Sequence, residues 1–229
     1  MKSPITLPVL LSLNAGYLDT AGFLALHGLF TAHVTGNFVT LGASIAYGAS
    51  GAVPKLLALP VFCVVVMATR AIGSRWLQPR GVNVLRTMHV AELVLLVTGA
   101  ALAIGLGPFP DGDQWPLILT GMVLVAAMAI QNATHRIHFA SAPPTTLMTG
   151  TTTQIMIDIA DLHGLTADQA AQTKARLKRM AKSVAAFTIG CGAGALLFGR
   201  FGEWCFVVPP AITAFAPFLP APPAPARKP

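Results

Sequence analysis

Charged residues are scarce in this sequence. Only 10% of its 229 residues are Asp, Glu, Lys or Arg, whereas a soluble domain carries about 25%. Hydrophobic residues make up 54% of the chain, and the mean hydropathy is +0.67. So few charges cannot cover a water-facing surface. The composition therefore excludes an ordinary soluble domain and predicts that lipid solvates the apolar excess.

Acidic residues and cysteines are both few in this sequence. The chain has 8 acidic and 15 basic residues, a net charge of +7. Its Lys and Arg residues lie in short gaps between apolar runs, as juxtamembrane cations do, so we expect no nucleic-acid partner. The 3 cysteines show no CxxC spacing. We therefore expect neither a disulfide framework nor a metal site, and no cofactor is indicated.

Catalytic signatures are also missing. The sequence contains no phosphate-binding loop, no HExxH and no Ser/His/Asp or Cys/His set with motif support, so we do not expect an enzyme. The first apolar stretch has no clear small-residue cleavage site and runs on past Asp19. We interpret it as a retained first helix and not as a signal peptide.

What the sequence does have is a series of apolar segments. They cover residues 5–26, 35–48, 56–73, 87–105, 116–134, 149–161, 183–199 and 205–219. A helix needs about 20 residues to cross the hydrocarbon core of a bilayer. Segments 35–48 and 149–161 are too short and are predicted to be broken or re-entrant half-crossings. The fold class is therefore all-α, with about six transmembrane helices.

The two short segments both begin with a Thr-Gly pair, Thr35-Gly36 and Thr149-Gly150. A helix that starts inside the membrane leaves its first N–H groups unpaired, and a Thr hydroxyl can accept one of these bonds. Gly permits the turn and a close approach. The alternative is that these small residues only allow tight helix packing. Because the pairs occupy matched positions, we favour a solute path.

The order of features repeats along the chain. Cys63 and Cys191 share their separation with Trp76 and Trp204, and each half carries polar residues before its Thr-Gly pair. This indicates one membrane domain, 1–219, made of two repeats at about 5–105 and 116–219. Residues 220–229 are Pro-rich and predicted to be a disordered tail. A capping box at Thr166 predicts a basic cytoplasmic helix before segment 183–199.

The distribution of cations sets the predicted topology. If the two short segments each enter and leave on one side, nearly all Lys and Arg residues lie in the cytoplasm, with Lys55 and Arg200 outside. The positive-inside rule favours this arrangement over eight full crossings. Each half then crosses three times, so the halves are inverted repeats. Both termini are predicted to be cytoplasmic, in a bacterial inner membrane.

Polar residues inside apolar segments are the candidate site residues. The predicted solute-binding set is Thr35, Gly36, Asn37, Thr149, Gly150, Thr151, Asn14, Gln131 and Asn132. The three amides outside the tips could equally join helices by hydrogen bonds. Asp19 is costly within the membrane and is therefore the candidate for ion or proton coupling, although neighbouring helix donors could also hold its carboxyl group.

A family resemblance covers most of the chain to about residue 205. GYLDTAGFLALHGLFTAHVTGNFVTLG, AIQNATHRIH and TTLMTGTTTQ resemble the YoaK family of bacterial inner-membrane proteins, a domain of unknown function (1275). The family pattern of G-x-x-D, TGN, QNA and TGT matches Gly16, Asp19, residues 35–37, residues 131–133 and residues 149–151. The resemblance implies a polytopic protein of about six helices and supplies no substrate.

The sequence thus predicts a small secondary transporter or permease for a small polar or anionic solute, with Asp19 as the candidate for proton coupling. A passive channel and a membrane enzyme or sensor remain alternatives, because half-helices also suit a pore and Asp19 could serve other chemistry. The expected partners are the lipid bilayer and the solute. A homodimer is compatible with so few helices.

Overall fold

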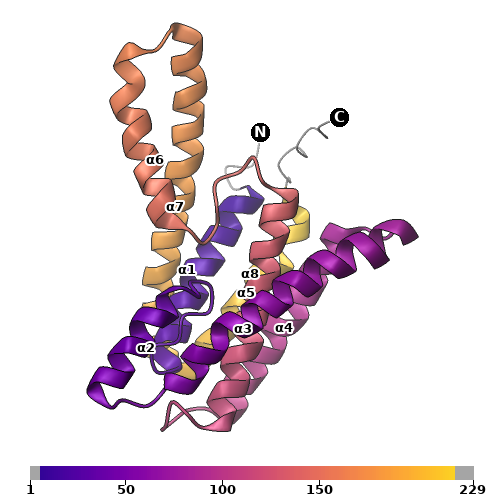
Figure 1. The fold of residues 1–229 in the computed structure, drawn as a ribbon, viewed down its shortest axis with the longest axis vertical. Coiled ribbons are helices and arrows are strands. Elements are labelled where there is room, and N and C mark those ends of the chain that lie inside the picture. The colour runs from indigo at the N-terminus through magenta and orange to yellow at the C-terminus, as the bar shows by residue number, and fades with distance from the viewer. Residues whose placement is uncertain (1–5, 220–229) are drawn as a thin grey trace.

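The computed structural model describes residues 6–219, and within that range the chain is helical with no strand (Figure 1). The α-helices are α1 (Leu7–Ala25), α2 (Gly36–Tyr47), α3 (Ala52–Ala71), α4 (Val84–Leu106), α5 (Trp115–His138), α6 (Met148–Asp161), α7 (Ala167–Phe201) and α8 (Val208–Ala214). The all-α fold class is confirmed. The predicted disordered tail lies outside the described residues.

Four described stretches are long and apolar enough to cross a membrane. They are Ala52–Arg80, Val84–Leu106, Trp115–His138 and Ala167–Phe218. The chain is therefore a polytopic membrane protein. Helix α1 has 19 residues, about 28 Å at 1.5 Å per residue, but polar residues interrupt its apolar character. The count of six crossings stays a prediction.

Helices α1 and α5 form the centre of the bundle. Helix α1 packs along α7, while α5 packs between α3 and α4. Leu18, Leu124 and Met128 lie in the main core and are fully buried. Many outward residues of α3 and α4 are apolar and exposed, for example Val64 and Val94, as expected of surfaces that face lipid.

Three glycines allow the close contact between α1 and α7. A Cβ on Gly16 would overlap the Phe187 carbonyl oxygen, and one on Gly190 would overlap the Leu13 carbonyl oxygen. Gly194 is held as closely against Tyr17. The backbones of the two helices therefore touch directly, as small residues permit in membrane proteins.

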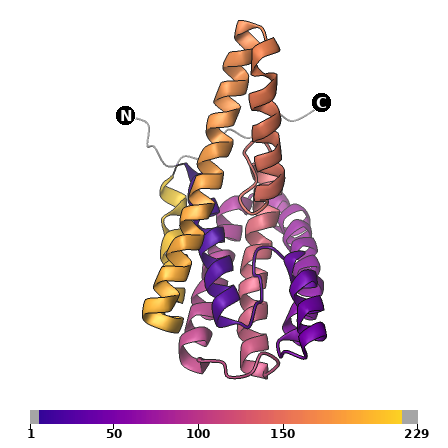
Figure 2. The ribbon, with the colours of Figure 1, turned by 90° about the vertical axis from the view of Figure 1, so that its left-hand side faces the viewer.

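Helices α2 and α6 are both short, with 12 and 14 residues. At 1.5 Å per residue these are about 18 Å and 21 Å long, less than the roughly 30 Å of hydrocarbon. Helix α2 lies beside α3 and descends toward one end of the bundle. Helix α6 lies beside α7 and extends toward the other end (Figures 1 and 2). That they are re-entrant stays a prediction.

The second half differs from the expectation at two places. The basic stretch and segment 183–199 form one continuous helix, α7, of 35 residues, so the predicted boundary between them is wrong. The capping box at Thr166 and Gln169 is confirmed. The last segment is shorter than expected, because Gly202–Val207 is a 3-10 turn and α8 has only 7 residues.

Candidate solute-binding site

Asp19 organises the connection between α1 and α2, which we call tip one (residues 26–35). Its Oδ1 accepts hydrogen bonds from the backbone N–H groups of Thr31 at 2.9 Å and Ala32 at 2.8 Å. Its Oδ2 pairs with Nδ1 of His33. The carboxylate is buried and folds the chain back toward the middle of the bundle, so that α2 starts there.

Asn37 closes the same tip. Its Oδ1 accepts the N–H of Phe30 at 2.8 Å, and its Nδ2 donates to the carbonyl of Phe30 at 2.9 Å. The side chain is 1% exposed. Asn37 therefore satisfies backbone groups that would otherwise be unpaired in an apolar surrounding.

The connection between α5 and α6 is tip two (residues 139–147), and amides of α5 hold it. Thr146 donates its hydroxyl to Oδ1 of Asn132 at 2.7 Å. Gln131 donates to Thr145 at 3.4 Å and to the Leu11 carbonyl at 3.3 Å. In both tips a polar residue on the long helix binds a residue 14 positions further on.

The expected capping role of the Thr-Gly pairs is wrong. Thr35 stands at the N-cap of α2, but its side chain makes no capping bond. Helix α6 starts one residue before Thr149, and the Thr151 hydroxyl donates to the Leu147 carbonyl. Hydroxyls here bond back along the helix, which competes with capping. A Cβ on Gly36 would press on the Phe30 ring. Nothing in the structure explains why a glycine stands at position 150.

The two tips border one cavity of about 450 Å³, which we call the central cavity. It is lined by Ala32, His33, Val34, Thr35, Leu59, Phe62, Val66, Arg70, Asn132, Ala133, Arg136, Ile137, Thr146 and Leu147. Thr35 and Leu147 are the N-cap residues of α2 and α6. Both short helices therefore begin at this cavity.

Two arginines give the central cavity its charge. Arg70 of α3 and Arg136 of α5 line it, and no Asp or Glu does. Among residues 6–219, neither guanidinium has a carboxylate at salt-bridge distance. Helix N-termini carry partial positive charge. The cavity therefore presents positive potential, and its remaining lining is mostly apolar.

A second cavity, which we call the lateral cavity, lies on the other side of tip one. It has about 400 Å³ and is lined by Asp19, Thr20, Phe23, Leu24, Phe30, His33, Gly36, Phe187 and Cys191. His33 is shared with the central cavity. The Asp19–His33 pair thus stands between the two cavities.

The structure brings together only some of the predicted site residues. Thr35 and Asn132 line the central cavity, while Asp19 and Gly36 line the lateral one. The others line neither cavity: Asn14 donates to Thr213 of α8, Asn37 and Gln131 bind backbone, and Thr149, Gly150 and Thr151 lie on α6.

Sequence reasoning missed Arg70, Arg136, His33 and Thr146 as cavity residues. Arg136 follows the QNA motif by three positions, which was the available signal. Arg70 carried no local signal, because only the packing of α3 against α5 brings it there. In the described part of the chain, no three His, Cys, Asp or Glu side chains are grouped as metal ligands.

The model of a protein family of unknown function, DUF1275, matches residues 7–219. This chain belongs to that family. The chain is also similar to the UPF0700 transmembrane protein YoaK of Bacillus subtilis (strain 168), to which it is 44% identical over 71 residues. That match covers 30% of this chain and 32% of the relative, so the chain spans about a third of the relative's length in the match. No solved structure matches.

Membership of DUF1275 agrees with the resemblance found in the sequence motifs, and the printed name of YoaK describes a transmembrane protein. Neither the description of the family nor the name of YoaK mentions a substrate. For this DUF1275 protein, function has to be argued from the central cavity itself.

Proposed function

We propose that this protein is a small secondary transporter of a small anionic solute, which binds in the central cavity. The observation that carries the proposal is that both short helices begin at one cavity lined by two arginines, neither of which has a carboxylate partner among residues 6–219. Positive helix ends and guanidinium groups both favour an anion. The apolar lining then favours a solute with an organic part, such as a small carboxylate.

The pairing of helices supports the inverted repeat that such a mechanism needs. Helix α1 packs against α7, and its counterpart α5 packs against α3. Helix α2 packs on α3 as α6 packs on α7. Each first helix therefore contacts the third helix of the other half, which is the exchange expected for two halves related by a twofold axis.

Several lining residues of the two cavities lie at matching positions in the two halves. Asn132, Arg136 and Thr146 line the central cavity and lie 113 positions after Asp19, Phe23 and His33, which line the lateral cavity. Leu59 and Phe187 also line corresponding places on α3 and α7. We interpret the cavities as counterparts on the two sides of the tips, which suits alternating access from two faces of the membrane.

Asp19 and His33 are the coupling groups in this proposal. They form the only pair of opposite titratable side chains at either cavity within residues 6–219. Protonation would weaken the contact that fixes tip one, so proton binding and tip movement are linked. The protein then acts in the bacterial inner membrane with both termini in the cytoplasm, as the positive-inside rule favours.

The first prediction tests the anion site through Arg136. In proteoliposomes, we expect uptake of a member of a panel of small organic carboxylates, driven by an inward proton gradient. Arg136→Gln should lower uptake at least tenfold, because the cavity loses one of its two full positive charges. Arg75→Gln is the control, since Arg75 is exposed and lines neither cavity.

The same assay separates the alternatives. Accumulation above the external concentration indicates a transporter, while flux that only equilibrates indicates a channel. Equal loss of uptake in both variants would contradict the placement of the site. Absence of flux for every carboxylate and inorganic anion would contradict transport and leave the sensor or enzyme alternatives.

A further inference from the structure

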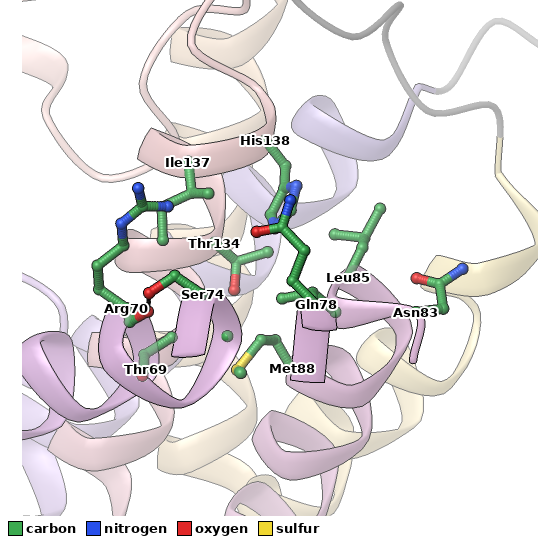
Figure 3. A pocket seen from close by; sticks show the side chains of 12 residues that line it. Thr69, Arg70, Ser74, Gln78, Asn83, Leu85, Met88, Thr134, Ile137 and His138 are labelled. Carbon is green, nitrogen blue, oxygen red and sulfur yellow. Dashed lines mark hydrogen bonds between the residues drawn. The ribbon is translucent and has the colours of Figure 1, made fainter. Parts of the chain in front are cut away.

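A third cavity, of about 490 Å³, lies where α3, α4 and α5 meet, near the end of α5 (Figure 3). We call it the terminal cavity. It borders the central cavity through Arg70 and Ile137, which line both. Its volume is within the range of small-molecule sites. Apart from the shared Arg70, the proposed transport mechanism uses none of its lining residues.

Thr134 is the feature that points to a ligand. It is 3% exposed and lines the terminal cavity, yet its hydroxyl has no hydrogen-bond partner in the part of the chain that the structure describes. Other helical threonines, such as Thr120 and Thr188, donate to the carbonyl four residues back. Figure 3 shows the Thr134 oxygen directed instead into the space between Ser74 and Met88. Leaving a buried hydroxyl unpaired costs free energy unless a ligand completes it.

His138 is the second unsatisfied group. Among residues 6–219 its Nε2 is buried without a partner, and the residue lines the same cavity (Figure 3). Thr134 and His138, both on α5, therefore present two buried and unsatisfied polar groups to one cavity.

The backbone of the wall is itself irregular. Residues Ile72–Leu77 form a π-helical turn that ends α3 and carries Gly73 and Ser74 into the lining. Single π-turns occur frequently at functional sites, because they redirect a side chain out of the α-helical register. A 3-10 turn at Gln78–Arg80 follows and places Gln78 over the cavity.

The charges and surfaces of the terminal cavity define the class of ligand. Arg70 lines it, α4 begins there at Val84 with Asn83 as its N-cap, and no Asp or Glu lines it. Hydrogen-bond donors and positive potential therefore dominate, which favours an acceptor such as a carboxylate. Leu85, Met88 and Ile137 supply an apolar wall beside the polar groups.

We propose that the terminal cavity binds an organic carboxylate, whose oxygens bond to Thr134 and His138 and whose apolar part packs against Leu85 and Met88. The carboxylate could be a soluble acid of short chain or the head of a bilayer fatty acid, because the recognising groups are the same. This inference is independent of the proposed transport, since binding is measured on purified protein without flux.

The test is binding of hexanoate to the full protein purified in detergent, measured by calorimetry with hexanamide as the uncharged control. We expect saturable hexanoate binding and at least tenfold weaker hexanamide binding. Thr134→Val should weaken hexanoate binding tenfold to a hundredfold, as expected for the loss of a hydrogen bond to a charged group. Without ligand, the same variant should melt at the same or a higher temperature, because it removes an unpaired buried hydroxyl.

Thr120→Val is the matched control, because the Thr120 hydroxyl is bonded to the Pro116 carbonyl and lies away from the cavity. It should leave hexanoate binding unchanged. A second arm uses palmitate: preference for palmitate identifies the bilayer as the source and supports the same carboxylate site. Absence of binding by both acids, equal binding of hexanamide, or unchanged binding in Thr134→Val overturns the proposal.

Discussion

At the scale of single residues, a buried carboxylate shapes tip one. Asp19 was recognised in the sequence because a charge inside an apolar segment is costly. The structure adds that Asp19 accepts hydrogen bonds from the backbone N–H groups of Thr31, Ala32 and His33 and also pairs with the His33 ring. A structural and a coupling role are therefore compatible in this residue, and the two can be separated by choosing which atoms to remove.

The second prediction compares two substitutions at Asp19. Asp19→Asn keeps an oxygen that can accept from Thr31 and Ala32, while Asp19→Ala leaves both N–H groups buried and unpaired. Each unpaired group costs roughly 1–3 kcal/mol. We expect Asp19→Ala to melt well below Asp19→Asn in detergent. Equal melting temperatures would show that the carboxylate does not hold the tip. Proton coupling should be lost in both variants, because both lack the charge of the carboxylate.

Residue types predicted which positions are unusual, but not what they contact. Asn37, Gln131 and Asn14 were assigned to solute on the strength of their polarity. In the structure Asn37 binds the Phe30 backbone, and Asn14 binds Thr213, which lies 199 positions away. The partner of a polar side chain depends on how the chain folds back, and sequence spacing does not contain that information.

At the scale of elements, the contact of α1 with α7 depends on two glycines that lie four positions apart on α7. Gly190 and Gly194 touch α1 backbone, while Gly192 between them faces open space. A GCGAG run therefore has one face that packs and one that does not. Only the structure shows which glycines of this run provide the packing.

The third prediction uses this difference. Gly190→Ala should destabilise the protein by several kcal/mol, because its Cβ would overlap the Leu13 carbonyl and force the helices apart. Gly192→Ala should be neutral or stabilising by up to about 1 kcal/mol, since Ala is the better helix former. Thermal melting in detergent checks both variants. Similar melting temperatures would contradict the close approach of α1 and α7.

The hairpin of α6 and α7 is held by an ion pair at its extended part. Arg176 donates to both carboxylate oxygens of Asp158, at 2.6 Å and 2.7 Å. The hydrogen bonds from Arg176 hold the pKa of Asp158 below its ordinary value, despite opposing burial. This lowered pKa means that the folded hairpin is stabilised when Asp158 is ionised.

The fourth prediction is the pH dependence of this hairpin. The stabilisation should be fully present at neutral pH and should fade as pH falls below about 4 and then through the lowered pKa of Asp158. Arg176→Gln should accelerate hydrogen exchange in α6 at pH 7, and this effect should become progressively smaller as pH falls below about 4 and through the lowered pKa of Asp158, after correction for intrinsic exchange rates. Arg179→Gln, at an exposed position of α7, is the control. An effect of Arg176→Gln that is independent of pH would contradict the ion-pair role.

At the scale of the whole molecule, the sequence predicted the main architecture. The all-α fold, the two short helices and the family followed from hydropathy, segment length and motif order. The central cavity could not be predicted, because it forms where α3 and α5 from different halves meet both tips. The continuous α7 was also missed, since a basic stretch and an apolar stretch can share one helix without a break.

The central claim is that the two tips reach one water-accessible cavity inside the membrane. Single cysteines at Thr35 and Leu147, in a background without the 3 native cysteines, can be treated with a membrane-impermeant anionic thiol reagent in liposomes. Exposed Asp111 and Arg80 serve as markers of the two sides, and Val94 as the lipid-facing control.

We expect the Thr35 and Leu147 cysteines to react, the Val94 cysteine to remain unmodified, and a short bifunctional reagent to join Thr35 to Leu147 in the double variant. We also expect the Asp111 and Arg80 markers to react from opposite sides. If neither tip cysteine reacts and no cross-link forms, the tips do not share an aqueous cavity and the account of this protein as a transporter is contradicted.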